Sequence, residues 1–428
     1  MRQYFRTVNY RRASVSPLAF AVALLLCGAS SKRVIAEDWL GFRGDSRSIS
    51  ETAQLPTDWS VDTCENIAWE VDLPGRGVSS PIVVDGRVVV TCSSGPREDR
   101  LHVIAFDQVS GKQLWKRNFW ATGRTLCNAT SAVAANTPVS DGERIYAFFS
   151  SNDLVALDLD GNVQWVRGLQ LNFPQAGNDV GMSSSPVVSG GSVVVQSEAL
   201  GASFVAAFDC RTGEMLWDLN RPLEATWSSP VALKVEKGRQ FIDAVAVQSR
   251  TRLDVYAAQT GESLWSQEIE CETIASCVSG DLLYVPSKGI KSYHVELESE
   301  ETVKPQWQEN RLQMGSPSPV IDGNRAFVIN RSGVLKCGAT DKAKGVKPWD
   351  LRLKGRFWAT PVLTSEAIYC INSDGLAFVV SLGSKGSSKK GKIISKPDFG
   401  EAVLGSPAVA DDAMFVRSHK HLWKISEK

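Results

Sequence analysis

The sequence is poor in the residues that usually carry catalysis or bind metals. Only four of its 428 residues are histidines, and no two of its nine cysteines are adjacent or form a CxxC pair. The cysteine and histidine spacing of structural zinc sites is therefore absent. The sequence also has no glycine-rich phosphate loop and no nucleophile elbow. We therefore predict no catalytic, cofactor-binding or metal-binding residues.

The chain also lacks an excess of charge of either sign. It has 47 Lys and Arg residues against 47 Asp and Glu residues. Six of the basic residues and none of the acidic ones lie in the first 36 residues, which leaves 41 basic against 47 acidic residues in the remainder. Such a mildly acidic chain has no electrostatic attraction for nucleic acid, so we predict no nucleic-acid partner.

No apolar run is long enough for a membrane-spanning helix, which needs roughly 20 residues. Residues 1–36 instead have a basic start and a shorter apolar run at 17–29. This order, with small residues before Glu37, is typical of a cleaved secretory signal peptide. We predict a signal peptide at 1–36, no transmembrane span after its cleavage, and a location in the periplasm or on the extracellular side of the cell envelope. An uncleaved anchor, twin-arginine export through Arg11 and Arg12, and lipidation of Cys27 are the alternatives.

Eight cysteines would remain in the mature chain. An exported protein permits disulfides, and Cys271 and Cys277 are close enough in sequence for a local one. We favour the alternative that most of the cysteines lie in strands as small buried apolar side chains.

Most of the chain repeats one supersecondary unit. Residues 101–115, LHVIAFDQVSGKQLW, contain an alternating strand, an Asp, a Ser-Gly turn and a second strand that ends in Trp. Variants recur at 204–217, FVAAFDCRTGEMLW, and at 253–265, LDVYAAQTGESLW. Such repetition predicts a repeat architecture, in which each unit buries its core against its neighbours.

A second signature marks the start of each unit, where small residues and a proline precede an apolar strand. Seven starts have proline and one has cysteine, at Pro81, Pro138, Pro186, Pro230, Cys277, Pro319, Pro361 and Pro407. Pairs such as Asp85-Gly86 and Asp141-Gly142 follow the first strands and predict two-residue hairpin turns. The starts are 42 to 57 residues apart, which predicts eight units of four short strands.

The strand count predicts how the ring closes. Residues 403–428 provide only three strands, whereas a lone strand at 67–73 precedes the first complete unit. We therefore predict an all-β, eight-bladed β-propeller over residues 64–428, in which the strand at 67–73 completes the last blade and leaves no open sheet edge. Residues 37–63, rich in Gly, Ser and Pro, are predicted to form an extended N-terminal segment that lies across the fold.

The repeated residues have structural roles in this interpretation. The Asp accepts backbone N–H bonds in the turn, and the Gly takes a positive φ there. The Ala lets adjacent blades approach, and the Trp fills the gap between them. The residues assigned to these roles are Ala105, Asp107, Gly111, Trp115, Trp165, Asp209, Gly213, Trp217, Gly261 and Trp265.

In this order the residues resemble the tryptophan-docking motif of the quinoprotein, or PQQ-repeat, propeller family. The resemblance covers about residues 64–428 and implies the eight-bladed fold. The family includes PQQ- and calcium-dependent alcohol and sugar dehydrogenases. It also includes non-enzymatic members, such as the propeller lipoprotein of the outer-membrane β-barrel assembly machinery.

The alcohol dehydrogenases of this family typically have an adjacent cysteine pair that stacks on the quinone, and this sequence has none. The resemblance therefore favours the non-enzymatic branch, a binding or protein-interaction scaffold for which no cofactor is expected. PQQ and calcium are expected only under the alternative, which is a PQQ- and calcium-dependent alcohol or sugar dehydrogenase or a carbohydrate-binding enzyme.

Long connections between blades are the remaining functional signal, because binding residues on a rigid scaffold usually lie on loops. The connections at 118–136 and 170–183 are long, and we expect the turn at 93–100 on the same face. We predict that they form a binding surface above blades one to three, for an envelope protein or a small polar ligand. We expect the protein to be a monomer or a subunit of a complex.

Charged and aromatic residues near the first strands are predicted to rim the central funnel. They are Arg76, Trp120, Arg124, Asp179, Trp227, Arg356 and Trp358. The alternative is that the Trp side chains pack on neighbouring loops and the Arg side chains are only solvated.

Overall fold

The computed structural model describes residues 38–177, 179–295, 304–340, 347–382 and 390–427. The signal peptide predicted at 1–36 lies outside these residues. The described residues form 32 strands and one short 3-10 helix, η1 (Leu169–Leu171). Among them no helix has the length and apolar character needed to cross a membrane.

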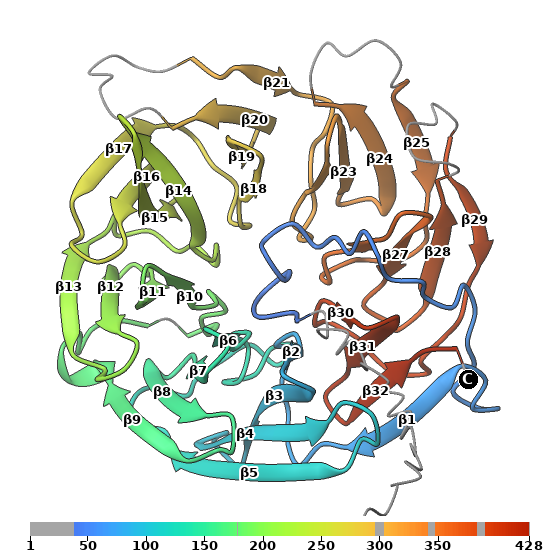
Figure 1. The fold of residues 1–428 in the computed structure, drawn as a ribbon, viewed down its shortest axis with the longest axis horizontal. Coiled ribbons are helices and arrows are strands. Elements are labelled where there is room, and N and C mark those ends of the chain that lie inside the picture. Colours follow the sequence, from blue (N-terminus) through green and yellow to red (C-terminus); the bar gives the residue numbers. More distant parts are fainter. Residues whose placement is uncertain (1–37, 178, 296–303, 341–346, 383–389, 428) are drawn as a thin grey trace, which may run out of the picture. The chain divides into compact units, whose positions relative to one another are not determined.

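The strands form eight antiparallel sheets of four strands each, arranged as blades around a ring (Figure 1). The first four blades consist of β2 (Ile82–Val84), β3 (Arg87–Ser94), β4 (Arg100–Asp107) and β5 (Gln113–Trp120); β6 (Val139–Ser140), β7 (Arg144–Phe148), β8 (Asp153–Asp158) and β9 (Val163–Gly168); β10 (Val187–Ser189), β11 (Ser192–Ser197), β12 (Phe204–Asp209) and β13 (Met215–Asn220); β14 (Val231–Lys237), β15 (Gln240–Gln248), β16 (Arg252–Ala257) and β17 (Ser263–Glu268).

The last four blades repeat this order, with one exception in blade 8. They consist of β18 (Cys277–Ser279), β19 (Leu282–Ser287), β20 (Gly289–His294) and β21 (Trp307–Glu309); β22 (Val320–Asp322), β23 (Arg325–Ile329), β24 (Val334–Ala339) and β25 (Trp349–Arg352); β26 (Val362–Leu363), β27 (Ala367–Ile371), β28 (Ala377–Ser381) and β29 (Lys392–Ser395); β30 (Ala408–Ala410), β31 (Ala413–Arg417), β32 (His421–Ile425) and β1 (Ile67–Asp72). The exception is that β1 comes from the other end of the chain.

The position of a strand in its blade explains its sequence. The first strands of neighbouring blades contact each other around the ring, so they are the innermost strands. Central strands such as β3 and β4 are buried along almost their whole length because adjacent blades cover both of their faces. Their near-continuous runs of Val, Ile and Ala fit burial on both faces. In the outermost strand β5 only Trp115 is buried, because the outer edge of the blade meets solvent.

Closure of the ring follows the prediction. β1 pairs antiparallel with β32, with Glu70 opposite Trp423 and Asp72 opposite His421. The buried Arg417 of β31 also joins blade 8 to blade 1, because its Nη1 donates to the carbonyl oxygen of Thr91 at 2.9 Å and to the hydroxyl of Ser79 at 3.1 Å. An eight-bladed propeller closed by an N-terminal strand is thereby confirmed.

The repeated turn residues have the roles that the sequence predicts. The Asp209 carboxylate accepts the backbone N–H groups of Arg211 and Thr212 at 2.9 and 2.8 Å. Gly111 and Gly213 have φ values of 71° and 66°, which residues with a Cβ adopt only at a cost. The Trp docks on the turn of the following blade, where the indole of Trp217 donates to the carbonyl oxygen of Ala258 at 2.9 Å.

The residue before each innermost strand explains the second signature. A serine or threonine stands directly before the proline or cysteine at all eight starts, at Ser80, Thr137, Ser185, Ser229, Ser276, Ser318, Thr360 and Ser406. The backbone N–H of Ser80 donates to the hydroxyl of Thr137, and that of Thr137 donates to the hydroxyl of Ser185. Proline favours extended backbone in the serine or threonine that precedes it. The backbone N–H of that residue is satisfied by the hydroxyl of the equivalent residue in the next blade.

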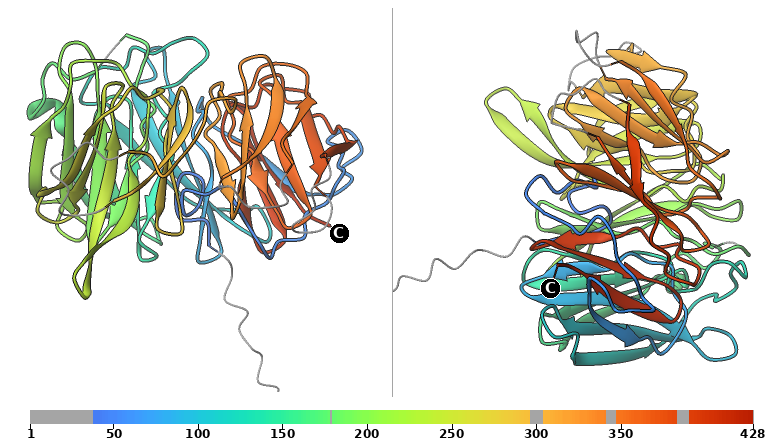
Figure 2. Two further views of the ribbon diagram at one scale, coloured as in Figure 1. Left: turned by 90° about the horizontal axis from the view of Figure 1, so that it is seen from above. Right: turned by 90° about the vertical axis from the view of Figure 1, so that its right-hand side faces the viewer.

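Residues 38–63 run across one end of the propeller. Trp39 forms a bridge with Val83 of β2 in blade 1, and Ile49 forms one with Leu363 of β26 in blade 7. The N–H of Gln54 then donates to Asp412 at the β30–β31 turn, at 2.7 Å. Figures 1 and 2 show this blue segment passing from the middle of the ring to its circumference before β1 begins.

The described cysteines are mostly core residues. Six of the eight are buried, and Cys271 and Cys277 are both free thiols. The local disulfide that the sequence permits is therefore not formed. Most of the described cysteines are small buried side chains, as favoured, but only four of the eight lie in strands.

Candidate functional site

The two ends of the propeller are built from different connections. Connections between successive blades lie at the same end as the turns between the second and third strands, since Arg76 and Ser93 form a backbone bridge. We call this end the loop face. The turns between first and second strands lie at the opposite end, which we call the hairpin face and which carries residues 38–63. Figure 2 shows the β14–β15 hairpin on the side of that segment.

Four loops of blades 1 to 4 touch one another in series on the loop face. The N–H of Asn128 in loop 121–138 donates to the carbonyl oxygen of Val180 in loop 169–186 at 3.1 Å. Phe173 of that second loop stacks on Phe204 with ring centroids 3.8 Å apart, next to loop 198–203. Glu198 in turn forms a bridge with Thr226 of loop 221–230. The loops therefore form one continuous surface.

This surface exposes large apolar side chains. Leu171 is 90% exposed and Leu200 is 77% exposed, although leucine is usually buried. Each of the four loops contributes at least one such residue, and together they form the apolar loop patch, which consists of Leu126, Leu171, Val180, Leu200 and Leu223. Soluble monomers rarely leave such a cluster uncovered unless it binds something.

A buried ion network fixes two of these loops from below. Arg221 at the end of blade 3 pairs with Glu198 at 2.9 Å and with Asp254 of β16. All three side chains are almost completely buried. Burial raises the pKa of Glu198 although the charge of Arg221 opposes it. Loop 198–203 starts at Glu198 and loop 221–230 starts at Arg221. The network therefore holds the backbones of both loops against the rigid blades.

Three of the predicted rim residues lie beside the patch. Arg124 and Asp179 form an ion pair between loops 121–138 and 169–186, with both side chains about half exposed or more. The indole of Trp227 donates to the carbonyl oxygen of Gly181 at 2.9 Å, so this half-buried ring packs on a neighbouring loop. The alternative interpretation of the tryptophans as loop-packing residues describes Trp227.

Arg76 organises the loops of blade 1. Its Nη1 donates to Glu98 at 2.6 Å, and its Nη2 donates to the carbonyl oxygens of Ala129 and Ser131. Glu98 in turn accepts the N–H of Val133 at 3.0 Å. The turn at 93–100 and the connection at 118–136 therefore meet on one face, as the sequence predicts, and Arg76 joins them.

The other three predicted residues lie elsewhere. Trp120 ends the outermost strand β5, where the guanidinium of Arg100 lies 5.3 Å from its ring centroid. Arg356 and Trp358 are exposed in the connection between blades 6 and 7, across the ring from the patch (Figure 1). The structure therefore places Trp120 on an outermost strand and away from the funnel, whereas Arg356 and Trp358 lie in a connection between blades, far from the other predicted residues.

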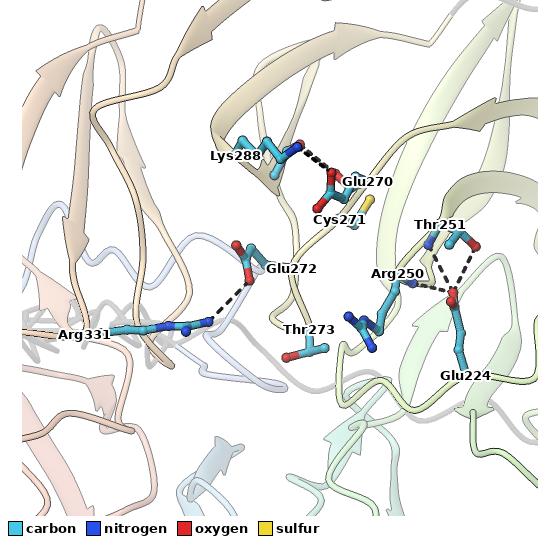
Figure 3. A pocket seen from close by; sticks show the side chains of 10 residues that line it. Glu224, Arg250, Thr251, Glu270, Cys271, Glu272, Thr273, Lys288 and Arg331 are labelled. Atoms are coloured by element: carbon cyan, nitrogen blue, oxygen red, sulfur yellow. Dashed lines mark hydrogen bonds and ion pairs between the residues drawn. The ribbon is translucent and has the colours of Figure 1, made fainter.

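A charged pocket that the sequence did not predict opens on the loop face beside β16, β19 and β23. It has a volume of about 520 Å³. Figure 3 shows the cationic side chains of Arg250, Lys288 and Arg331 around it, with Glu270 and Glu272 as partners. Lys288 pairs with Glu270 at 2.9 Å, whereas Arg331 lies 3.9 Å from Glu272. Such a lining suits a small polar ligand and not an apolar one.

A signal for this pocket is present in the repeat itself. Arg250, Lys288 and Arg331 occupy the turn between the second and third strands in three successive blades. Aligning the blades on their turns, and not only on their tryptophans, would have placed three cations side by side.

The comparisons with known proteins bear on the family and the fold. The family model described as "Outer membrane protein assembly factor BamB" matches residues 62–232, 175–287 and 201–331, which together span more than half of the chain. The chain belongs to this PQQ-repeat propeller family. None of the curated proteins compared with it matches its sequence.

Solved structures with a similar fold include BamB and quinoprotein dehydrogenases. The crystal structure of BamB from Moraxella catarrhalis is 15% identical with a TM-score of 0.58, covering 85% of this chain and 97% of that one. A europium-containing methanol dehydrogenase is 14% identical with a TM-score of 0.60, covering 89% of each chain. The quinohemoprotein alcohol dehydrogenase ADHIIG from Pseudomonas putida HK5 is 14% identical with a TM-score of 0.63, covering 90% and 80%. At these identities the likeness concerns the fold alone.

Calcium requires six to eight oxygen ligands, usually with several carboxylates. The described ranges contain no group of three or more His, Cys, Asp or Glu residues that could hold a metal ion. The hydroxyls of Thr137, Ser185 and Ser229 each accept a backbone N–H from the preceding blade.

Proposed function

We propose that this PQQ-repeat propeller is an exported, non-catalytic scaffold of the cell envelope that binds a partner protein through its loop face. The observation that carries the proposal is the apolar loop patch, in which Leu171, Leu200 and Leu223 are each more than half exposed on three loops that touch one another. Covering these side chains removes apolar surface from water, which is the main favourable term in protein association.

The surroundings of the patch also suit a protein interface. Interfaces combine an apolar centre with a polar, solvent-accessible rim. The exposed Arg124–Asp179 pair provides such a rim beside Val180. The buried Arg221 network holds the loops in place, so binding would require little ordering of the backbone.

The family membership supports the same class of function. The matched family is described as an assembly factor for outer membrane proteins, and the described part of this chain lacks the donor set for calcium. We therefore propose that the protein works without a cofactor and as part of a complex. The dehydrogenase alternative is supported only by fold likeness to enzymes.

Site-specific photo-cross-linking in cells of the native host tests the proposal. A photoreactive amino acid is placed at Leu171, Leu200 or Leu223 of the full-length protein. The control position is Phe241, which is 67% exposed on the β14–β15 hairpin at the other end of the propeller. We expect one discrete cross-linked protein from the three loop positions and not from the control. Equal products from all four positions, or none from the loop positions, would overturn the proposal.

A double substitution then separates binding from folding. Leu171→Ser with Leu223→Ser removes two exposed side chains and should change the free energy of unfolding by less than about 1 kcal/mol, as surface substitutions usually do. The same double variant should lose the cross-link from position 200.

A further inference from the structure

Arg43 occupies an unusual place in the N-terminal segment. It lies between Trp39, which bridges to blade 1, and Ile49, which bridges to blade 7. Its Nη2 donates to the carbonyl oxygen of Ser276, the residue before the innermost strand of blade 5. The backbone at Arg43 has φ 64°, a conformation that disfavours residues with a Cβ. The segment therefore holds this side chain against the inner strands at an energetic cost.

The guanidinium of Arg43 is buried, and no acidic residue of the described ranges forms an ion pair with it. The charge of Asp45 acts on it only from beyond ion-pair distance, where it opposes the fall in the pKa of Arg43. The residue is 1% exposed, and its Nε and Nη1 atoms have no hydrogen-bond partner within the described residues. Phe42 lies 5.1 Å below the guanidinium carbon and covers one face of the group. The neighbouring Asp45 pairs with the exposed Arg47 and not with Arg43. Burial lowers the pKa of Arg43 to about 10, so the group still carries its charge at neutral pH.

Other polar groups of the inner strands are also unsatisfied. The hydroxyls of Ser184 and Ser228, two residues before the prolines of blades 3 and 4, are buried without a partner among the described residues. Blade 4 is the neighbour of blade 5, whose Ser276 contacts Arg43. Buried polar groups are nearly always hydrogen-bonded, to protein, ordered water or ions.

We propose that Arg43 binds a small inorganic anion, such as chloride or phosphate, inside the ring of innermost strands. An isolated buried charge is very unfavourable unless a counter-ion accompanies it. Three N–H bonds of the guanidinium, one on Nε and two on Nη1, are unused within the described residues and donate only. An anion supplies both the counter-charge and the hydrogen-bond acceptors that the guanidinium needs, whereas water supplies only the acceptors.

The anion would fasten the N-terminal segment to the propeller. With it, Arg43 joins residues 38–63 to the inner strands through a charge pair in addition to the single bond to Ser276. This site is buried around Arg43 and contains none of the exposed residues of the apolar loop patch, so it is independent of that patch and of the partner proposed there.

Bromide, which replaces chloride and scatters anomalously, provides the direct test. Crystals of the protein soaked in sodium bromide should give an anomalous peak at hydrogen-bonding distance from Nε or Nη1 of Arg43. The absence of a peak there, with only water density beside the guanidinium, would overturn the proposal. Peaks of equal height at exposed arginines would also overturn it, because they would show adventitious binding.

Thermal unfolding in solution gives a second readout. At constant ionic strength, chloride or phosphate should raise the melting temperature of the wild-type protein saturably, by about 2 °C or more, since a ligand that binds only the folded state stabilises it. Comparing the two salts identifies which anion is preferred.

Matched arginine variants assign the effect. Arg43→Gln should abolish the anion-dependent rise, whereas Arg47→Gln, four residues further along and exposed, should retain it. If Arg43→Gln does not fold, Arg43→Lys keeps a cation at the site and should retain a weaker rise. An unchanged rise in Arg43→Gln would overturn the proposal.

Discussion

Trp69 of β1 docks on Gly111 in the turn between β4 and β5. The indole Nε1 donates to the carbonyl oxygen of Gln108 at 3.1 Å, and a Cβ atom on Gly111 would lie 2.8 Å from ring atoms Cγ and Cδ2. The same arrangement joins Trp217 of blade 3 to Gly261 in the β16–β17 turn of blade 4. The glycine is therefore required twice, by its positive φ and by the ring that covers it.

Gly111→Ala separates these two requirements when it is compared with Gly86→Ala. Gly86 also has a positive φ, 72°, but a Cβ atom added to it would have no atom within 4 Å. Gly86→Ala should lower the free energy of unfolding by about 1–2 kcal/mol, the cost of left-handed backbone. Gly111→Ala should lose about 1–3 kcal/mol more, because the tryptophan must move. Urea denaturation of the purified protein measures both, and equal losses would show that the contact has no energetic weight.

Asp209→Asn should reveal the contribution of a turn carboxylate to pH-dependent stability. The backbone N–H of Thr212, followed by its hydroxyl and the N–H of Arg211, lowers the pKa of Asp209 below its ordinary 3.8. A carboxyl group whose folded pKa is depressed stabilises the fold above its unfolded pKa, and this contribution disappears as the pH falls through the folded pKa.

We therefore expect wild type to exceed Asp209→Asn in stability near neutral pH, by at most about 1 kcal/mol because the turn is exposed. The difference should vanish as the pH falls well below 3.8. Denaturation at both pH values measures it. A difference of the same size at both would show that the charge of Asp209 plays no part.

PQQ and calcium, added together, should leave the melting temperature unchanged. The physical reason is that the described residues do not supply the group of carboxylates that calcium needs. A thermal-shift titration measures this, with a known quinoprotein dehydrogenase as the positive control. A saturable rise would contradict the scaffold proposal and restore the dehydrogenase alternative.

The sequence predicts the ring because its information is local and repeated. Each repeated feature depends on residues in the same unit or in the next one. This holds for the Asp209 turn, for the contact of Trp217 with the next blade, and for the prolines before the innermost strands. The missing fourth strand of blade 8 is a matter of counting, so Trp69 could be assigned to it without knowing any contact.

The candidate site is less predictable, since it depends on which loops meet across blades. Trp120 falls within the connection predicted at 118–136. In the structure β5 continues through this residue, so Trp120 lies on the outermost strand opposite Arg100. Leu171 and Leu200 attract no notice in the sequence because leucine is expected in the core. Only their positions on the loops between strands in the folded propeller reveal that they are exposed.

The pairing of β1 with β32 also sets an order for folding. During synthesis β1 is made before the other described strands and β32 after them, so the sheet that unites the two cannot form until β32 has been made. Until then β1 has a free edge, and the loop that must be closed includes nearly the whole protein. A ring of this kind stays open along the polypeptide until β32 has been made, and it loses its closing seam when either β1 or β32 is removed.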